Sequence, residues 1–121
     1  MRQALISFRR SPLFTVRVCD TFFSRLRGLM FRKRVHSRQG LFFMTQRESI
    51  RDLSIHSFFV FFLFDAVWLD KHFRVVDIHI RVTPFTFLLR PRKPAQYLLE
   101  LPAETARSLS FGQRLRVKFK N

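Results

Sequence analysis

The sequence has few cysteines, glycines and acidic residues, and each scarcity limits what the protein does. Its one cysteine, Cys19, excludes an internal disulfide framework and fits a reducing cytosol. Its three glycines lie at positions 28, 40 and 112, too far apart for a glycine-rich phosphate-binding loop. It has only eight acidic residues but 23 Lys and Arg, so its net charge is +15 and its surface attracts polyanions.

Long hydrophobic runs are also missing. The most apolar stretch, residues 58–69, is interrupted by Asp65 and is far shorter than the roughly 20 residues that cross a bilayer. Near the N-terminus only three apolar residues stand in succession before two arginines intervene, which is unlike a signal peptide. We therefore expect a soluble, cytoplasmic protein.

Apolar residues are plentiful and follow strand-like patterns. Of the 121 residues, 47% are hydrophobic, including 17 Phe, which is enough for the core of one domain over residues 1–121. Residues 45–53 are polar and predict a connection, and short helices are expected over residues 22–27 and from Pro102 to about residue 109. Strand-like segments dominate, at residues 15–18, 41–44, 55–59, 64–69, 74–82, 97–101 and 114–120. The pattern predicts a mainly β sandwich or barrel with one or two short helices.

Basic residues gather in two places that predict a nucleic-acid interface. In residues 114–120, Arg and Lys alternate with apolar residues, so one face of the expected strand is fully basic. Residues 31–39 form a second basic segment, expected to be a loop. The candidate residues are Arg32, Lys33, Arg34, Arg38, Arg114, Arg116, Lys118 and Lys120, with Arg9, Arg10 and Arg17 as an extension. The alternative is a solvated surface on a very basic protein.

Asp65 is an acid inside an apolar run, and a buried carboxylate needs partners. One explanation is structural: an ion pair with Arg27, Arg47 or Arg51, or hydrogen bonds from the backbone, would lock a hairpin. The other explanation is functional, with Asp65 and His56 meeting across neighbouring strands as a candidate site for a small polar ligand. An enzyme that uses this His–Asp pair is a further alternative.

The spacing of His and Ser residues indicates neither a metal site nor a hydrolytic triad. The four His residues, at positions 36, 56, 72 and 79, show no paired metal-ligand spacing, so no metal and no cofactor is expected. Ser57 beside His56 does not indicate a hydrolytic triad, because adjacent strand residues point to opposite faces. We therefore assign no catalytic residue.

An ordered set of short phrases carries a family resemblance. The phrases are residues 20–21 (DT), 27–32 (RGLMFR), 40–43 (GLFF), 55–59 (IHSFF), 65–70 (DAVWLD), 75–76 (VV) and 97–103 (YLLELPA), closing toward Gly112. Together they resemble the domain of unknown function 192 family, also called uncharacterised protein family 0127, over about residues 14–119. The His-containing phrase at residues 55–59 is more similar to archaeal members than to bacterial ones.

The resemblance implies a compact β-sandwich of the jelly-roll kind and brings no established activity. The expected function is therefore a small intracellular binding or accessory domain, with nucleic-acid binding as the alternative. The chain departs from the family pattern at Leu63, where Pro is usual, and at Phe61, where a polar residue is common. The resulting excess of apolar residues over 58–64 suggests a contact with a partner subunit, and a homodimer is one alternative.

Overall fold

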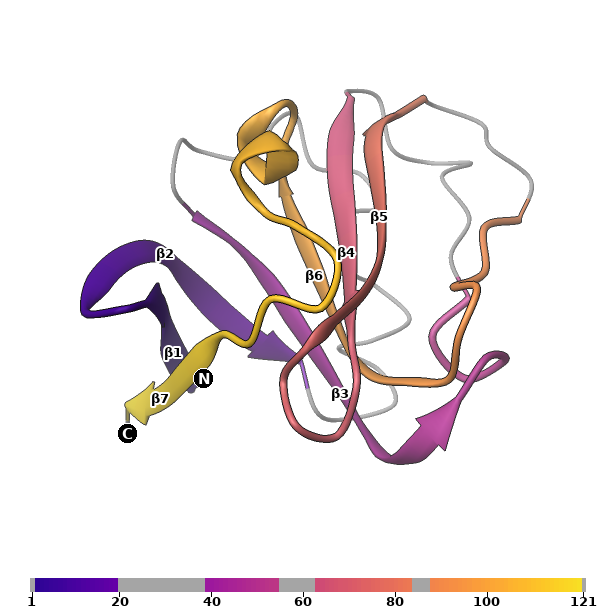
Figure 1. Ribbon diagram of the computed structural model, residues 1–121, viewed down its shortest axis with the longest axis horizontal. Coiled ribbons are helices and arrows are strands. Elements are labelled where there is room, and N and C mark those ends of the chain that lie inside the picture. The colour runs from indigo at the N-terminus through magenta and orange to yellow at the C-terminus, as the bar shows by residue number, and fades with distance from the viewer. Residues whose placement is uncertain (1, 20–38, 55–62, 84–87, 121) are drawn as a thin grey trace.

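The computed structural model describes residues 2–19, 39–54, 63–83 and 88–120, most of which lie in β-strands (Figure 1). One 3₁₀ helix, η1 (Thr105–Ser108), accompanies the strands. The strands are β1 (Gln3–Phe8), β2 (Ser11–Cys19), β3 (Gln39–Ser49), β4 (Phe64–Leu69), β5 (Val75–Val82), β6 (Ala95–Pro102) and β7 (Arg116–Lys120). The predicted mainly β fold is confirmed.

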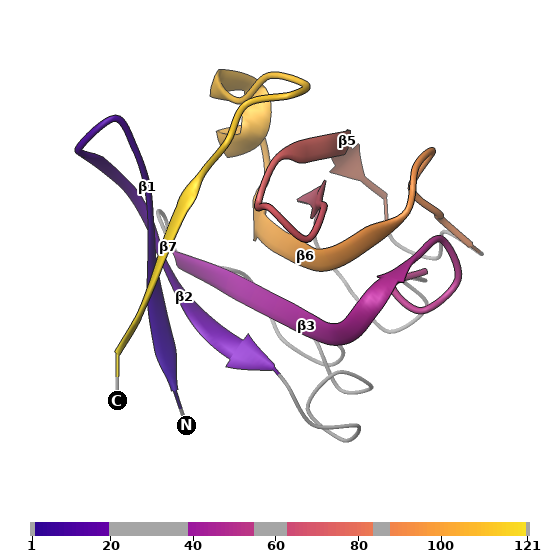
Figure 2. The ribbon, with the colours of Figure 1, turned by 60° about the horizontal axis from the view of Figure 1, so that its bottom comes forward.

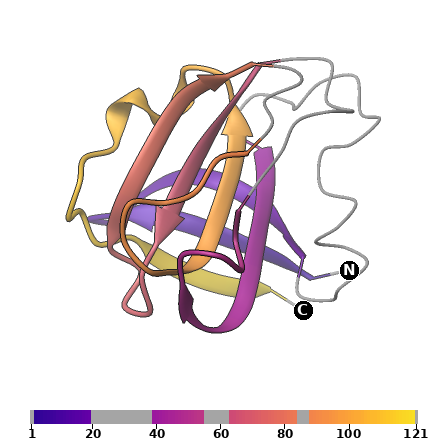
Figure 3. The same ribbon diagram turned by 90° about the vertical axis from the view of Figure 1, so that its right-hand side faces the viewer.

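The strands hydrogen-bond to one another in a single curled sheet. Its order is β5-β4-β6-β3-β2-β1-β7, in which β2 and β3 run parallel and the other neighbours run antiparallel. The curl forms a half-barrel (Figure 2), and β1, β2 and β7 cross beneath β4, β5 and β6 at a steep angle (Figure 3).

The two edges of the sheet meet just before β7. Arg74, which precedes β5, forms an isolated antiparallel bridge with Arg114. The backbone N–H of Leu115 donates to the carbonyl of Phe73 at 2.9 Å, and that of Gly112 donates to Val75 at 2.8 Å. The chain segments at opposite edges of the sheet are therefore held together by backbone hydrogen bonds.

Both faces of strand β4, which lies between β5 and β6, are buried. Val67 and Leu69 belong to one apolar cluster, inside the curl with Phe42 and Leu99. Ala66 and Trp68 belong to a second cluster on the other face of the strand. The indole N–H of Trp68 donates to the carbonyl of Leu53 at 3.0 Å, which ties the segment after β3 to this second cluster.

Three boundaries differ from the sequence expectations. Strand β3 continues to Ser49, through residues predicted to be a connection, and its pairing with β6 resumes at Ser49–Ala95 after an irregularity. Within the irregular stretch, the Thr45 hydroxyl donates to the carbonyl of Gln96 at 3.0 Å. Strand β6 includes Pro102, so the short helix begins at Thr105. Strand β1 was not expected from the sequence, and it pairs with both β2 and β7.

The expected alternation over residues 76–81 is wrong at Val76. A register shift separates the pairs Trp68–Asp77 and Leu69–Val75, so Val76 packs against the second cluster. Ile78 and Ile80, predicted to share its face, pack against the first cluster. The expected helix at 22–27, the strand at 55–59 and the apolar residues 58–62 lie outside the described residues, so the homodimer stays a prediction.

Candidate nucleic-acid interface

A cleft of about 760 Å³ opens between the β1–β2 turn and the segment that enters β7. Figure 1 shows β7 running beside β1 at the left of the molecule. Four of the lining residues are arginines and the other four are apolar. They are Phe8, Arg9, Arg10, Phe73, Arg114, Leu115, Arg116 and Val117, and we call them the basic cleft.

The β1–β2 turn brings two arginines to the rim of the basic cleft. Phe8 pairs with Ser11, so Arg9 and Arg10 are the two loop residues of the hairpin. Both have positive φ, 49° and 70°, as in the turn type that favours Asn-Gly. A left-handed conformation costs a residue with a side chain roughly 1–2 kcal/mol. Arginine at both positions therefore opposes the local backbone preference.

The opposite wall contains Phe73, whose backbone is also left-handed, with φ of 62°. The Asp70 carboxylate fixes this turn, since it accepts the backbone N–H of His72 at 2.8 Å and that of Arg74 at 3.0 Å. Burial alone would raise the pKa of Asp70, but these hydrogen bonds and the Arg74 guanidinium hold it below its ordinary value. The Phe73 ring lies 4.6 Å from the ring of Tyr97, so the aromatic wall is anchored in the core.

The basic surface continues from the cleft along β7. Arg116, Lys118 and Lys120 are exposed and alternate with half-buried Val117 and Phe119. Across residues 2–19, 39–54, 63–83 and 88–120, no carboxylate forms an ion pair with Arg10, with Arg114 or with the three basic residues of β7. Ion pairs between described residues involve Arg47, Arg74, Arg81, Arg92 and Arg107 instead. The positive charge at the basic cleft is therefore not neutralised by the described acids.

The structure brings together part of the predicted nucleic-acid set. Arg114 and Arg116 line the basic cleft with Arg9 and Arg10, and Arg17 lies at the end of β2 away from the turn. Lys118 and Lys120 follow on β7. The other predicted residues, Arg32, Lys33, Arg34 and Arg38, lie outside the described residues. The apolar lining of the cleft was not expected, because no local pattern relates Phe73 to β7.

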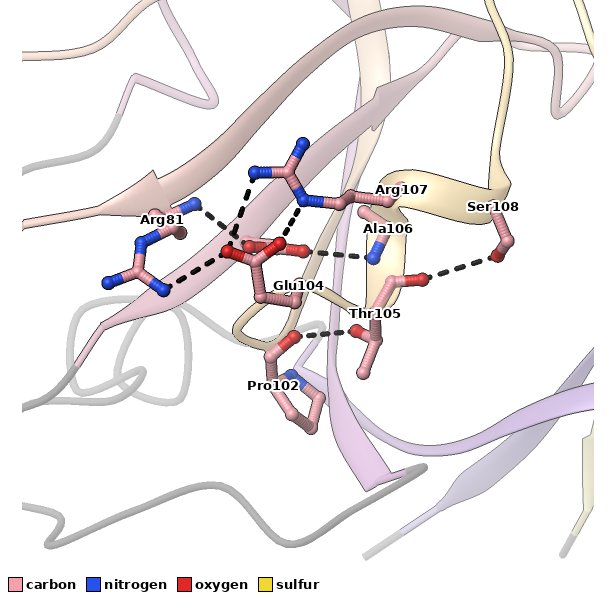
Figure 4. A network of polar contacts seen from close by, with 8 residues as sticks. Arg81, Pro102, Glu104, Thr105, Ala106, Arg107 and Ser108 are labelled. Atoms are coloured by element: carbon pink, nitrogen blue, oxygen red, sulfur yellow. Dashed lines mark hydrogen bonds and ion pairs between the residues drawn. The ribbon is translucent and has the colours of Figure 1, made fainter.

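Asp65 has a structural role in the fold. It is fully buried, and its two oxygens accept the backbone N–H of Arg81 and of Ala106, both at 2.9 Å. These hydrogen bonds tie β4 to β5 and to η1 (Figure 4). Of the arginine partners considered from the sequence, Arg47 instead lies 3.6 Å from Asp52, and Arg27 lies outside the described residues. His56 lies outside the described residues, so the His56–Asp65 ligand site stays a prediction.

An exposed ion-pair cluster lies above Asp65. Glu104 accepts hydrogen bonds from the side chains of Arg107 and Arg81, the latter at 3.1 Å (Figure 4). The Arg107 hydrogen bond, followed by that of Arg81, lowers the pKa of Glu104. The same partnership raises the pKa of Arg107. This cluster fastens η1 to β5.

A second His–Asp pair, Asp77 and His79 on β5, was not recognised as a pair from the sequence. Asp77 is fully buried and accepts the backbone N–H of Ile78 and of Arg92. His79 Nε2 lies 3.7 Å from Asp77 Oδ2, beyond hydrogen-bond length, and its ring stands edge-on to Trp68. The described ranges contain no group of three or more His, Cys, Asp or Glu residues arranged to hold a metal ion.

The fold and the cleft define a small, strongly basic, mainly β domain built on one curled sheet. The chain belongs to the domain of unknown function 192 family, described as "Uncharacterized ACR", whose sequence profile matches residues 6–119. A UPF0127 protein of Thermococcus kodakarensis is 39% identical over 94 residues, covering 78% of this chain and 57% of its own length. One from Pyrococcus horikoshii is 35% identical over 103 residues, covering 84% and 85%. The resemblance to archaeal members is confirmed.

Two solved structures share the fold. A putative transcription regulator from Sinorhizobium meliloti superposes with a TM-score of 0.83 at 21% identity, covering 97% of this chain and 94% of that one. A protein of unknown function from Novosphingobium aromaticivorans superposes with a TM-score of 0.82 at 17% identity, covering 94% and 83%. The family has no established activity. None of the described helical residues forms a helix long and apolar enough to cross a membrane.

Proposed function

We propose that this chain is a nucleic-acid-binding β domain that contacts phosphates through the basic cleft and the exposed face of β7. The observation that carries the proposal is the convergence of Arg9, Arg10, Arg114 and Arg116 on one cleft. The guanidinium group pairs bidentately with phosphate, and a row of such groups gives affinity for a phosphate backbone. The cytosol expected from the single cysteine would supply RNA and DNA in abundance.

The position of the arginines supports binding more than general basicity does. Like charges placed together repel, so gathering four arginines at one cleft has an electrostatic cost that a bound polyanion would remove. Arg9 and Arg10 also occupy turn positions that disfavour them, as their φ values of 49° and 70° indicate. The Arg9 guanidinium lies 5.1 Å from the centre of the Phe8 ring, and this contact offsets part of the backbone cost at Arg9. At Arg10 no such contact is seen among the described residues, and its unfavourable backbone supports a role in binding.

Protection of an exposed sheet edge is the competing explanation. Charged residues on an edge strand prevent it from pairing with another chain, and β7 is such an edge strand. This accounts for Arg116, Lys118 and Lys120, which alternate along β7. It does not account for Arg9 and Arg10, which lie in a turn, or for Arg114, which precedes the strand. Binding explains both groups.

The fold relative from Sinorhizobium meliloti is described as a putative transcription regulator. That description is consistent with contact to nucleic acid, although at 21% identity the likeness itself concerns only the fold. The charge arrangement of this chain therefore carries the proposal.

The test is a salt series of binding to fluorescent single-stranded RNA and duplex DNA with nuclease-treated protein. The cleft variant carries Arg10→Gln, Arg114→Gln and Arg116→Gln. The matched control carries Arg51→Gln, Arg90→Gln and Lys93→Gln, three exposed cations from segments at the other end of the molecule (Figure 1). Each variant loses three positive charges, so net charge is the same in both.

The proposal predicts that wild-type binding persists at about 0.15 M salt, where long-range attraction is strongly screened. The cleft variant should reduce the slope of log affinity against log salt by roughly two to three, and the control should reduce it much less. Equal losses in the two variants would mean that charge acts only as a diffuse field and would contradict the proposal.

A further inference from the structure

The basic cleft combines charged and apolar surface, whereas a patch that binds only phosphates needs charge alone. Four arginines line it together with half-buried Phe8, Phe73 and Val117, and Leu115 packs beneath them, 2% exposed. We propose that this cleft receives one unpaired base of a single-stranded nucleic acid, while the arginine rim holds the flanking phosphates. This inference rests on the proposed function and specifies the kind of nucleic acid.

The chemistry of a single strand matches this lining. Each nucleotide offers a flat, weakly polar base and a charged phosphate a short distance apart, so an apolar wall beside guanidinium groups meets both. In a duplex the bases are paired and stacked inside, and the groups that face a protein are mainly phosphate and sugar. The apolar lining would then face no matching surface.

The cleft is large enough to admit one nucleotide. Its volume of about 760 Å³ falls in the range of roughly 300–1,000 Å³ that is usual for sites holding one small organic group. The aromatic wall is also fixed before binding. Phe73 packs on Tyr97 with ring centroids 4.6 Å apart, so ordering this wall on contact costs little entropy.

Backbone strain concentrates at the same place. Five residues other than glycine have positive φ within the described ranges, and three of them, Arg9, Arg10 and Phe73, line the basic cleft. The other two, Arg81 and Glu104, belong to the network around Asp65. A bulky aromatic residue rarely adopts this conformation, and strained residues cluster at binding sites. Strain on both walls of one cleft is an observation independent of its charge.

The probe that isolates the base is an abasic strand. A fluorescent oligothymidylate is compared with a strand of the same length and phosphate count in which every sugar lacks its base, by anisotropy at about 0.15 M salt. Wild-type protein should bind the intact strand roughly 5- to 150-fold more tightly, the range expected for stacking of one base. Duplex DNA of the same length should bind more weakly than the intact single strand.

The aromatic wall is tested by Phe73→Leu, which keeps apolar volume and removes the ring. The matched control is Phe111→Leu, because Phe111 is 60% exposed and lies outside the cleft. Phe73→Leu should reduce the preference for the intact strand at least several-fold while leaving affinity for the abasic strand unchanged, and Phe111→Leu should change neither. If Phe73→Leu does not fold, the comparison of intact and abasic strands on wild-type protein still tests whether the protein binds a base.

The experiments distinguish failure of the base-pocket inference from failure of the proposed nucleic-acid binding. Equal affinity of wild-type protein for intact and abasic strands, together with a selective loss in the cleft charge variant, would overturn the base pocket and leave phosphate binding in place. A charge variant no worse than its control would overturn the proposed function as well. Loss of the preference in Phe111→Leu instead of Phe73→Leu would place base stacking elsewhere and would also overturn this inference.

Discussion

Arg9 and Arg10 are consecutive loop residues of the β1–β2 hairpin and both have left-handed backbones, with φ of 49° and 70°. A two-residue hairpin loop of this kind is most stable with Asn-Gly. The chain instead places two cations there, at the rim of a cleft that also contains Arg114 and Arg116. The hairpin therefore gives up local stability at the point where positive charge gathers.

The first prediction concerns the stability that the hairpin loses by having Arg9 and Arg10 in its loop. The double variant Arg9→Asn/Arg10→Gly should increase the free energy of unfolding by about 1–2 kcal/mol, because Asn and Gly tolerate positive φ. The same variant should weaken binding to nucleic acid, since two rim cations are lost. Chemical denaturation measures the first effect and anisotropy the second.

A charge-conserving variant provides the control for that experiment. Arg9→Lys/Arg10→Lys keeps both cations and the unfavourable backbone, so it should retain wild-type stability and most of the affinity. Some loss is expected because Lys cannot form bidentate contacts with phosphate. Wild-type affinity in the Asn-Gly variant would show that the turn arginines do not contribute to binding.

The second prediction concerns Asp65. Asp65→Asn should destabilise the fold by about 1–3 kcal/mol, because an amide nitrogen replaces one of two oxygens that accept backbone hydrogen bonds in a fully buried position. Asp52→Asn is the comparison, since Asp52 is more exposed and pairs with Arg47 at 3.6 Å. Equal melting temperatures for wild type and Asp65→Asn would be incompatible with a structural role.

The third prediction concerns the close approach of β3 and β6. A Cβ atom on Gly40 would lie 2.4 Å from the backbone oxygen of Glu100, so Gly40→Ala requires one strand to move. We expect a loss of roughly 1–3 kcal/mol, measured by urea denaturation. Gly112→Asn is the control, because nothing lies within 4 Å of that Cβ position and Asn tolerates its positive φ of 81°. A stable Gly40→Ala variant would refute the proposed steric conflict.

The fourth prediction concerns acid stability. The pKa of Asp70 is lower in the folded protein than its ordinary value of 3.8, so the folded state releases this proton more readily than the unfolded chain. Its contribution to stability is therefore present above that ordinary value and is lost as the pH falls through the folded-state pKa. Asp70→Asn should lower stability at pH 7 and flatten the decline on acidification, as followed by urea denaturation at several pH values. Parallel pH curves for the two proteins would contradict this account.

Much of the sheet was predictable because strands leave a local signature. Alternation over residues 114–120 predicted a strand with one basic face, and β7 has exposed Arg116, Lys118 and Lys120 as expected. Asp65 was recognised as an acid that needs buried partners. Its partners were not predictable, since they are backbone N–H groups of β5 and η1, brought near only by the tertiary fold.

The basic cleft was not predictable as a unit for the same reason. It forms because β1 pairs with β7 and because Phe73 meets Leu115 where the sheet edges join. Each of these contacts joins segments far apart in the sequence. The Arg9-Arg10 turn also lacks the Asn or Gly that normally marks a tight hairpin, so neither the hairpin nor β1 was expected. The left-handed backbone at Arg9 and Arg10 therefore became visible only in the structure.

The most direct measurement is a nuclear magnetic resonance titration of ¹⁵N-labelled protein with a short oligothymidylate at about 0.15 M salt. The account predicts that the backbone amide signals of Arg9, Arg10, Phe73 and residues 114–117 shift progressively and saturate, while those of residues 50–54 and 88–93 stay in place. Shifts spread evenly over all exposed basic residues, or confined to segments away from the β1–β2 turn, would contradict the assignment of the basic cleft as the nucleic-acid interface.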